Sequence, residues 1–202
     1  MNKELSMNHA AVDGLAVHRS AGMAFLRYAG IVLAGSALVA ISSRIAVPLY
    51  FTPVPLTLQP FAVLLLGLLL TPRLAAVTLA AYLAEGALGL PVFAPTALGI
   101  SGVAHLLGPT GGYLMAYPVA AGLISLIWRS TNRGFAAAAA SAAVGDAVIL
   151  GFGALWLSFS THASIQTNLM LAVVPFLPGE ALKIAAAAGI ASGFRRLRKR
   201  AA

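Results

Sequence analysis

Two ionisable side chains stand three residues apart near the end of the chain, in a stretch that is otherwise apolar. Glu180 and Lys183 follow Pro178 in the segment PFLPGEALK, residues 175–183. Residues three apart share a helix face, so this carboxylate and this ammonium can present an acceptor and a donor to one small molecule. Charged groups inside a membrane span are costly and usually functional. The pair is therefore the first candidate ligand site, with mutual neutralisation inside a bundle as the alternative.

The residues before this pair favour a helix that begins at Pro178. Proline suits the first helical position, where its missing N–H costs nothing. Such a helix would aim its free N–H groups and partial positive charge at the site, which favours anionic ligand groups. Counting back from Arg195 at about 1.5 Å per residue places Glu180 roughly 22 Å away, in the outer third of a bilayer.

The composition indicates a membrane protein. The chain of 202 residues is 60% hydrophobic and only 9% charged, and its mean hydropathy is +0.92. A soluble core does not need so large an apolar share. The sequence has no cysteine, which excludes disulfides and thiolate metal sites. The net charge of +8 falls mostly outside the apolar runs, so we expect no nucleic-acid partner.

The apolar runs predict an all-α integral membrane protein with six transmembrane helices and long outer loops that cap a ligand pocket. We expect a disordered cytoplasmic tail at residues 1–20, a transmembrane domain at 21–195 and a basic cytoplasmic tail at 196–202. A short helix over residues 165–174 is expected to lie across one end of the bundle. The six predicted spans are residues 25–47, 57–70, 72–89, 111–128, 135–158 and 178–194.

The basic residues predict the orientation. With six spans, almost all of them fall on one side, which makes both termini cytoplasmic. The long uncharged connections, residues 46–56, 90–110 and 159–174, then crowd the outer face, where we expect the ligand. The residues that set this alternation are Lys3, Arg19, Arg27, Arg73, Arg129, Arg133, Arg195, Arg196, Arg198, Lys199 and Arg200.

Four ordered segments together resemble the BioY family, the biotin-specific, substrate-capturing S components of energy-coupling-factor (ECF) transporters. They are PVPLTLQ at 53–59, GLPVF at 89–93, LGPTGGY at 107–113 and PFLPGEALK at 175–183. The resemblance implies a six-helix, multi-pass protein of a bacterial or archaeal cytoplasmic membrane that captures biotin and is not an enzyme. It also implies a coupling subunit and ATPase subunits as partners, and no cofactor or metal. No P-loop motif occurs in the chain, in keeping with ATP hydrolysis on another subunit.

The same resemblance implies a set of ligand-binding residues. The biotin ureido ring has two N–H donors and one carbonyl, which complement the carboxylate of Glu180 and the ammonium of Lys183. Lys183 could instead take the biotin carboxylate. Apolar wall residues, an amide, two glycine N–H groups and two hydroxyls complete the expected site. Ordinary loop packing is the alternative for the wall residues, and a hydrogen bond to a loop carbonyl is the alternative for the amide. These residues are Val54, Phe93, Tyr113, Gln59, Gly111, Gly112, Thr96 and Ser101.

A strip of small residues on the first helix resembles the surface with which such S components dock on the coupling subunit. It comprises Gly30, Ala34 and Ala37, and packing within the bundle is the alternative. Asp146 lies at membrane depth among small residues, so we expect it to form an interhelical hydrogen bond.

Other functions remain open at this stage. An S component for another vitamin and a stand-alone proton-coupled carrier of a small organic acid are the alternatives, and the second would use a buried carboxylate such as Asp146. An intramembrane enzyme is disfavoured because no catalytic constellation converges in one segment. A homo-oligomer is a further open possibility.

Overall fold

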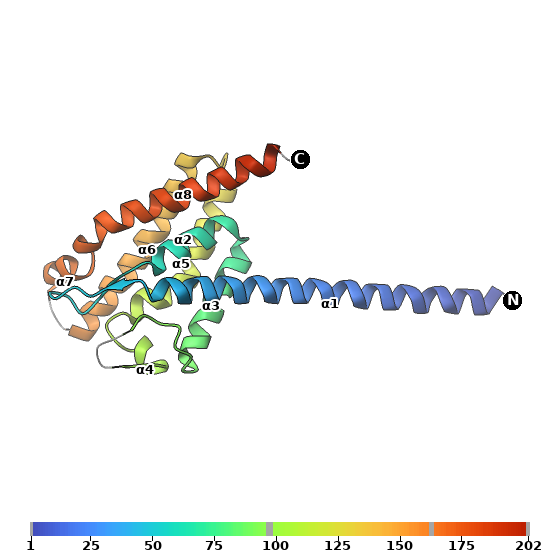
Figure 1. Cartoon of the computed structure of the whole chain (residues 1–202), viewed down its shortest axis with the longest axis horizontal. Coiled ribbons are helices and arrows are strands. Elements are labelled where there is room, and N and C mark those ends of the chain that lie inside the picture. Colours follow the sequence, from blue (N-terminus) through green and yellow to red (C-terminus); the bar gives the residue numbers. More distant parts are fainter. Residues whose placement is uncertain (1, 96–98, 162–163, 201–202) are drawn as a thin grey trace.

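The fold comes from a computed structural model that describes the backbone of residues 2–95, 99–161 and 164–200, and the side chains from residue 22 onward except that of Ile165. The disorder expected for the tail at residues 1–20 stays a prediction. Figure 1 shows a bundle of helices with short elements gathered at one end. The elements in chain order are α1 (Asn2–Ser43), β1 (Ala46–Val47), β2 (Leu56–Thr57), α2 (Gln59–Leu69), α3 (Pro72–Ala87), α4 (Val103–Leu106), α5 (Gly111–Arg129), α6 (Phe135–Thr161), α7 (Ile165–Ala172), the 3-10 helix η1 (Val174–Phe176) and α8 (Leu177–Arg200).

Four segments of the described chain are long and apolar enough to cross a membrane: Gly22–Ser43, Gly111–Arg129, Phe135–Thr161 and Gln166–Arg200. The count of six spans is therefore not confirmed. The two other predicted spans correspond to α2, with 11 residues, and α3, with 16 residues. At about 1.5 Å per residue both fall short of the roughly 30 Å hydrocarbon layer. They are short because Pro72 opens a new helix at a tight turn.

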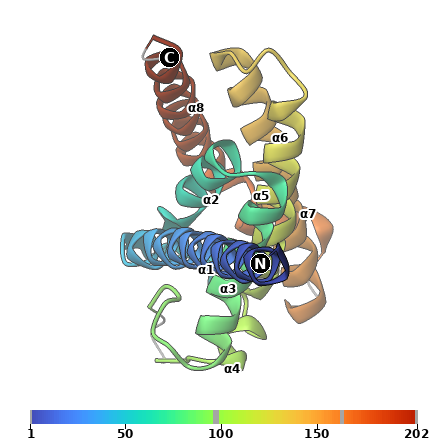
Figure 2. The same cartoon turned by 90° about the vertical axis from the view of Figure 1, so that its right-hand side faces the viewer.

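The helices pack around α5. It contacts α2, α3 and α6, whereas α1 lies on the side of the bundle against α2 and α3. Figure 2 looks along α1 and shows it crossing the middle of the molecule, with α8 and α6 spread above it. Close approach depends on glycine: a Cβ on Gly67 would lie 3.0 Å from Ala121 O, and one on Gly145 would lie 2.3 Å from Ile124 side-chain atoms. Small residues at helix crossings are what membrane bundles use to pack without a hydrophobic driving force.

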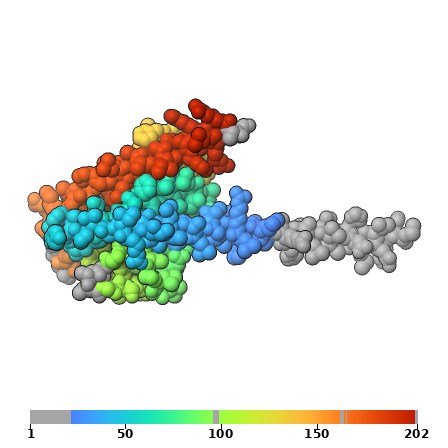
Figure 3. Space-filling model, in the orientation of Figure 1, coloured from blue at the N-terminus to red at the C-terminus, as the bar shows by residue number. Residues whose placement is uncertain are grey.

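The two ends of the bundle differ in their connections. The α2–α3 turn, the α5–α6 turn and the C-terminal end of α8 share one end, and β1, β2, α4 and α7 share the other (Figure 1). Figure 3 shows residues 22–43 of α1 lying along the outside between these ends. The gathering of the long loops at one end agrees with the sequence-based arrangement.

The loops at this second end, here called the loop end, are fixed by side-chain hydrogen bonds to backbone carbonyls. Thr52 Oγ1 donates to Leu171 O at 2.9 Å, Ser43 Oγ to Val92 O at 2.8 Å, and Trp156 Nε1 to Gly108 O at 2.8 Å. A two-residue antiparallel ladder pairs Ala46 with Thr57 and Val47 with Leu56. Residues 46–47 were predicted to be the end of the first helix, which instead stops at Ser43.

Candidate functional site

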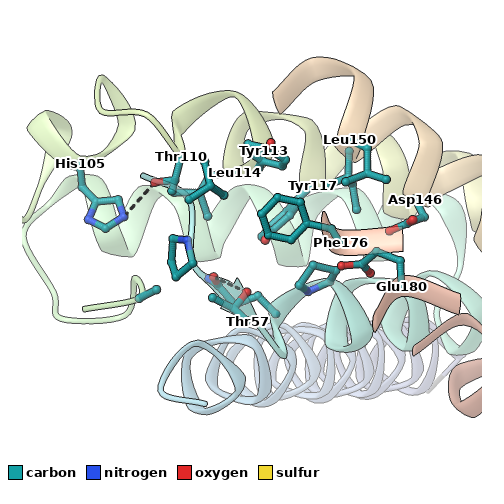
Figure 4. A pocket seen from close by; sticks show the side chains of 16 residues that line it. Thr57, His105, Thr110, Tyr113, Leu114, Tyr117, Asp146, Leu150, Phe176 and Glu180 are labelled. Carbon is teal, nitrogen blue, oxygen red and sulfur yellow. Dashed lines mark hydrogen bonds between the residues drawn. The ribbon is translucent and has the colours of Figure 1, made fainter. Parts of the chain in front are cut away.

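A cavity opens between the loop end and the middle of the bundle. It holds about 530 Å³ of space free of protein atoms, counted out to its mouth. Figure 4 shows its lining side chains converging from the β1–β2 region, α5, α6, η1 and the start of α8. The lining residues are Val54, Pro55, Thr57, Gln59, Pro60, Ala94, His105, Thr110, Tyr113, Leu114, Tyr117, Asp146, Ile149, Leu150, Phe176 and Glu180.

Glu180 reaches the inner part of the cavity from the first turn of α8. Its Oε1 accepts a hydrogen bond from Lys183 Nζ at 2.7 Å, and both residues are buried. The other oxygen, Oε2, is buried without a hydrogen-bond partner among the described residues. Lys183 is not among the residues that line the cavity, and its ammonium neutralises Glu180. The pair predicted from the sequence is therefore formed, with one acceptor oxygen left unused.

Asp146 faces the same inner part of the cavity from α6. Figure 4 shows its carboxylate close to that of Glu180. Asp146 is 4% exposed, and its Oδ1 has no hydrogen-bond partner in the described part of the chain. The interhelical partner expected for Asp146 is Glu180 of α8, whose carboxyl interacts with that of Asp146. The inner cavity thus combines two carboxylates with one ammonium, and a buried acceptor that stays unpaired is costly.

The middle of the cavity is aromatic and aliphatic. Tyr113, Tyr117 and Phe176 lie between the carboxylates and the mouth (Figure 4). The Tyr113 and Phe176 ring centroids are 6.4 Å apart, and Tyr113 OH donates to Ala172 O at 2.6 Å. A Cβ on Gly153 would lie 2.2 Å from the Tyr113 ring, so α6 backs this ring directly. The wall is therefore a fixed apolar surface, as predicted for Tyr113.

The mouth is polar. His105, from the short helix α4, lies 3.4 Å from Thr110 Oγ1 through Nε2 and 3.2 Å from Ile100 O through Nδ1. Its ring stacks on Phe93 with centroids 4.9 Å apart. His105 and Thr110 also line a second hollow of about 810 Å³ under the proline-rich outer loops. The cavity and this second hollow therefore adjoin at His105 and Thr110.

Two further predicted residues line the cavity. Val54 contributes apolar surface, and Gln59 stands at the start of α2. Gln59 Nε2 donates to Tyr82 OH, and Tyr82 OH donates to Val92 O at 3.0 Å. Thr57 Oγ1 donates to Gln59 Oε1 at 3.4 Å. Gln59 is therefore held by a network that leads back to the 90–95 loop.

The remaining predicted residues are placed elsewhere. Phe93 lies behind the cavity wall, packed edge-on against Tyr82 at 5.5 Å. A Cβ on Gly111 would lie 1.7 Å from Leu106 O, and one on Gly112 would lie 2.2 Å from Trp156, so both glycines serve close packing and do not line the cavity. Ser101 is exposed and off the cavity, and Thr96 lies outside the described residues.

The small-residue strip of α1 faces outward. Gly30, Ala34 and Ala37 are exposed, and nothing lies within 4 Å of a Cβ built on Gly30. The opposite side of α1 faces the bundle: Gly35 approaches Thr78, and Ser36 Oγ donates to Glu85 of α3. Packing within the bundle thus uses other α1 residues than the strip.

Most of the residues that line the cavity were not predicted from the sequence. Tyr117, Ile149 and Leu150 lie in none of the four motif segments, and Phe176 lies in PFLPGEALK but was not singled out. Which face of an apolar helix borders a cavity cannot be judged from an all-apolar pattern. Asp146 gave a usable signal, since it is an acidic residue within a span. His105 was not among the site residues predicted from the sequence, and it is buried at the cavity mouth.

Comparison with known proteins gives a consistent result. The sequence profile of the BioY family matches residues 9–200. A probable biotin transporter BioY of Pyrococcus horikoshii is 40% identical over 156 residues, which cover 77% of this chain and 88% of the relative. The biotin transporter BioY of Thermotoga maritima is 35% identical over 162 residues, 80% of this chain and 92% of the relative. A crystal structure of the S component for biotin from an ECF-type ABC transporter superposes with a TM-score of 0.76 at 27% identity, covering 85% of this chain and 92% of that one.

Proposed function

The chain belongs to the BioY family, and from this we propose that it captures biotin at the membrane as the S component of an ECF-type transporter. Relatives named biotin transporter and a structural neighbour described as the S component for biotin support this assignment. On this proposal the chain binds and delivers a ligand and catalyses no reaction. A coupling subunit and ATPases would supply the energy.

One observation of the site carries the proposal: two buried carboxylate oxygens at the inner end of the cavity, Glu180 Oε2 and Asp146 Oδ1, have no hydrogen-bond partner among the described residues. The biotin ureido ring offers two N–H donors, one for each of these acceptors. Lys183, already 2.7 Å from Glu180, compensates the charge and holds that carboxylate in place. Hydrogen bonds to ionised acceptors are the stronger kind and contribute most in a dry site.

The rest of the cavity suits the remainder of biotin. The sulfur ring and valeryl chain are apolar, and the Tyr113, Tyr117 and Phe176 side chains supply an apolar middle section. Two more polar side chains, His105 and Thr110, stand at the mouth. We assign the biotin carboxylate to this mouth, because Gly111, Gly112 and Ser101 do not border the cavity.

The membrane arrangement follows from the same proposal. We infer six crossings, with the α2–α3 hairpin completing the four long spans, and both termini on the cytoplasmic side. The short, basic turns at the end opposite the loops support this orientation. The exposed Gly30, Ala34 and Ala37 strip is the surface that we assign to the coupling subunit, because a partner helix can approach closely where side chains are small.

The test is a ligand-dependent thermal shift of the purified protein in detergent with biotin, dethiobiotin, thiamin and riboflavin. Binding to the native state raises the melting temperature by mass action. We expect a shift with biotin that is lost in Glu180→Ala and Lys183→Ala. A shift with another vitamin but none with biotin would refute the substrate. An equal biotin shift in native protein and both variants would refute the site.

A further inference from the structure

A second hollow lies at the end of the bundle opposite the biotin cavity and combines positive charge with apolar surface. It holds about 700 Å³ of space free of protein atoms. Its walls come from the ends of α2 and α5, the α5–α6 turn and the last third of α8, at the upper right of Figure 1. We call this hollow the arginine groove. It is lined by Leu68, Leu69, Trp128, Arg129, Arg133, Ala191, Phe194, Arg195 and Arg198.

Four arginines in one groove repel one another unless an anion joins them. The only ion pair among the described residues joins Lys183 to Glu180, so none of the four has a carboxylate partner there. The acidic residues of the described chain lie elsewhere. Glu85 accepts a hydrogen bond from Ser36 of α1, and Asp146 and Glu180 line the biotin cavity.

Two of the arginines are held in position. Arg129 Nε donates to Ser125 Oγ at 3.1 Å and to Leu70 O at 3.4 Å. Arg195 Nη1 donates to Asn132 O, which joins α8 to the α5–α6 turn. Arg129 is bonded through Nε, and Arg195 through a single Nη. Guanidinium groups with fixed stems and remaining N–H donors match the geometry of a phosphate group.

A buried donor in the groove also lacks an acceptor. Trp128 is 5% exposed, and its Nε1 has no hydrogen-bond partner within the described residues. Indole N–H is a donor only and normally finds a partner when buried. An anionic oxygen in the groove would satisfy it.

Apolar side chains beside the arginines favour a lipid over a soluble anion as the ligand of the groove. Leu69 is 39% exposed and Phe194 is 53% exposed, and both line the groove. They offer a surface for acyl chains directly next to the cationic groups. Basic pockets between membrane helices are a recognised way to bind anionic headgroups.

We propose that the arginine groove binds an anionic phospholipid, with the headgroup phosphate among Arg129, Arg133, Arg195 and Trp128 Nε1 and the acyl chains along Leu69 and Phe194. The site is separate from the biotin cavity and does not depend on it. A bound lipid would connect α2, α5 and α8 at the basic end.

The test is native mass spectrometry of the full chain, delipidated and titrated with phosphatidylglycerol or phosphatidylcholine. We expect tighter binding of phosphatidylglycerol. Arg129→Gln/Arg195→Gln should weaken it by on the order of 25-fold, taking about fivefold for each basic residue, with little change for phosphatidylcholine. Trp128→Phe should weaken it about tenfold, the loss of one hydrogen bond to a charged group.

The matched control is Arg196→Gln/Arg200→Gln, which removes the same charge from exposed positions of α8 that do not line the groove. We expect this variant to bind phosphatidylglycerol like the native chain. An equal loss in the control would overturn the site and leave only a general charge effect. If Arg129→Gln impairs folding, as judged by thermal unfolding, Arg133→Gln/Arg198→Gln tests the groove instead.

Two further measurements separate the lipid from its headgroup. Inorganic phosphate should compete only weakly, and Phe194→Ser should weaken phosphatidylglycerol binding. If phosphate displaces the lipid completely at equal concentration and Phe194→Ser has no effect, the groove is a small-anion site and the lipid assignment is wrong. Equal binding of the two lipids would refute the proposal as a whole.

Discussion

The two ends of the bundle differ in how deeply their charged side chains are buried. At the loop end, Glu180 and Asp146 are 3% and 4% exposed, and a single ammonium accompanies them. At the basic end, Arg129, Arg133 and Arg195 are half-buried and keep contact with the surface. Burying a charge costs several kcal/mol unless partners replace water, whereas a half-buried charge keeps part of its hydration. The loop end should therefore be sensitive to every change of partner, and the basic end should tolerate single losses.

The largest effect is expected at Lys183. In Lys183→Met, Glu180 and Asp146 lose their buried cation, and breaking such a pair costs about 3–5 kcal/mol of unfolding free energy. Biotin binding should be lost as well. Thermal unfolding in detergent and biotin titration measure the two effects.

The double variant Glu180→Gln/Lys183→Met separates these effects. Removing both charges should restore most of the stability without restoring binding, because the ligand still lacks its charged acceptor. A double variant that binds biotin like the native chain would show that the pair serves only stability.

Asp146→Asn comes next. The amide keeps the size of the side chain but replaces one carboxyl oxygen, an acceptor facing the cavity, with an NH₂ donor, so biotin should bind about 10- to 100-fold more weakly. Stability should not fall, because one of two neighbouring carboxylates has been neutralised. Isothermal titration and thermal unfolding test the two parts.

The same variant discriminates against a proton-coupled carrier. If Asp146→Asn leaves biotin affinity unchanged but abolishes uptake driven by a pH gradient in proteoliposomes, the carboxylate moves protons and our assignment of its role is wrong. Under the biotin-capture proposal, the pH gradient has no effect on uptake in either protein.

A smaller effect is expected from the wall of the cavity. Gly153→Ala would place a Cβ 2.2 Å from the Tyr113 ring, and overpacking of this kind costs about 1–3 kcal/mol. The displaced ring would also narrow the cavity and weaken biotin binding. The matched control is Gly151→Ala on the same helix, where nothing lies within 4 Å, and it should be neutral or slightly stabilising. Equal behaviour of the two variants would mean that Tyr113 is not held by α6.

The smallest expected effect is that of changes in the arginine groove on biotin affinity at the other end of the bundle. Arg129→Gln/Arg195→Gln should leave the biotin dissociation constant within about twofold, because separated sites without shared partners add to within about 0.3–0.5 kcal/mol. Biotin titration of this variant is the measurement. A larger change would reveal coupling between the groove and the cavity, and the two ends could then no longer be treated as independent.

The sequence predicted the centre of the site better than its walls. Glu180 and Lys183 stood out because charges in apolar helices are rare, and their spacing alone placed them within reach of each other. Phe176 and Tyr117 could not be recognised, since their role depends on how helices far apart in the chain pack. Asp146 was visible as a buried acid, but its direction toward Glu180 depends on the packing of α6 against α8.

The same distinction explains the misplaced glycines. Gly111 and Gly112 were interpreted as a ligand cradle, whereas the space that a Cβ would need is filled by Leu106 O and Trp156. Sequence shows that a glycine is present but not which neighbour requires it. Residues 57–70 were predicted to cross the membrane as a short helix. The observed α2 has 11 residues, so this crossing stays a prediction.

The hydrogen bonds that fix the loop end have one chemical property in common. Thr52, Ser43, Tyr113 and Trp156 all donate to main-chain carbonyl oxygens. Every amino acid carries that oxygen, so a change of side chain at an accepting position does not remove the acceptor of the hydrogen bond. In these four contacts only the donor side chain is under constraint, and homologues could therefore diverge at the accepting positions while the entrance for the vitamin keeps its shape.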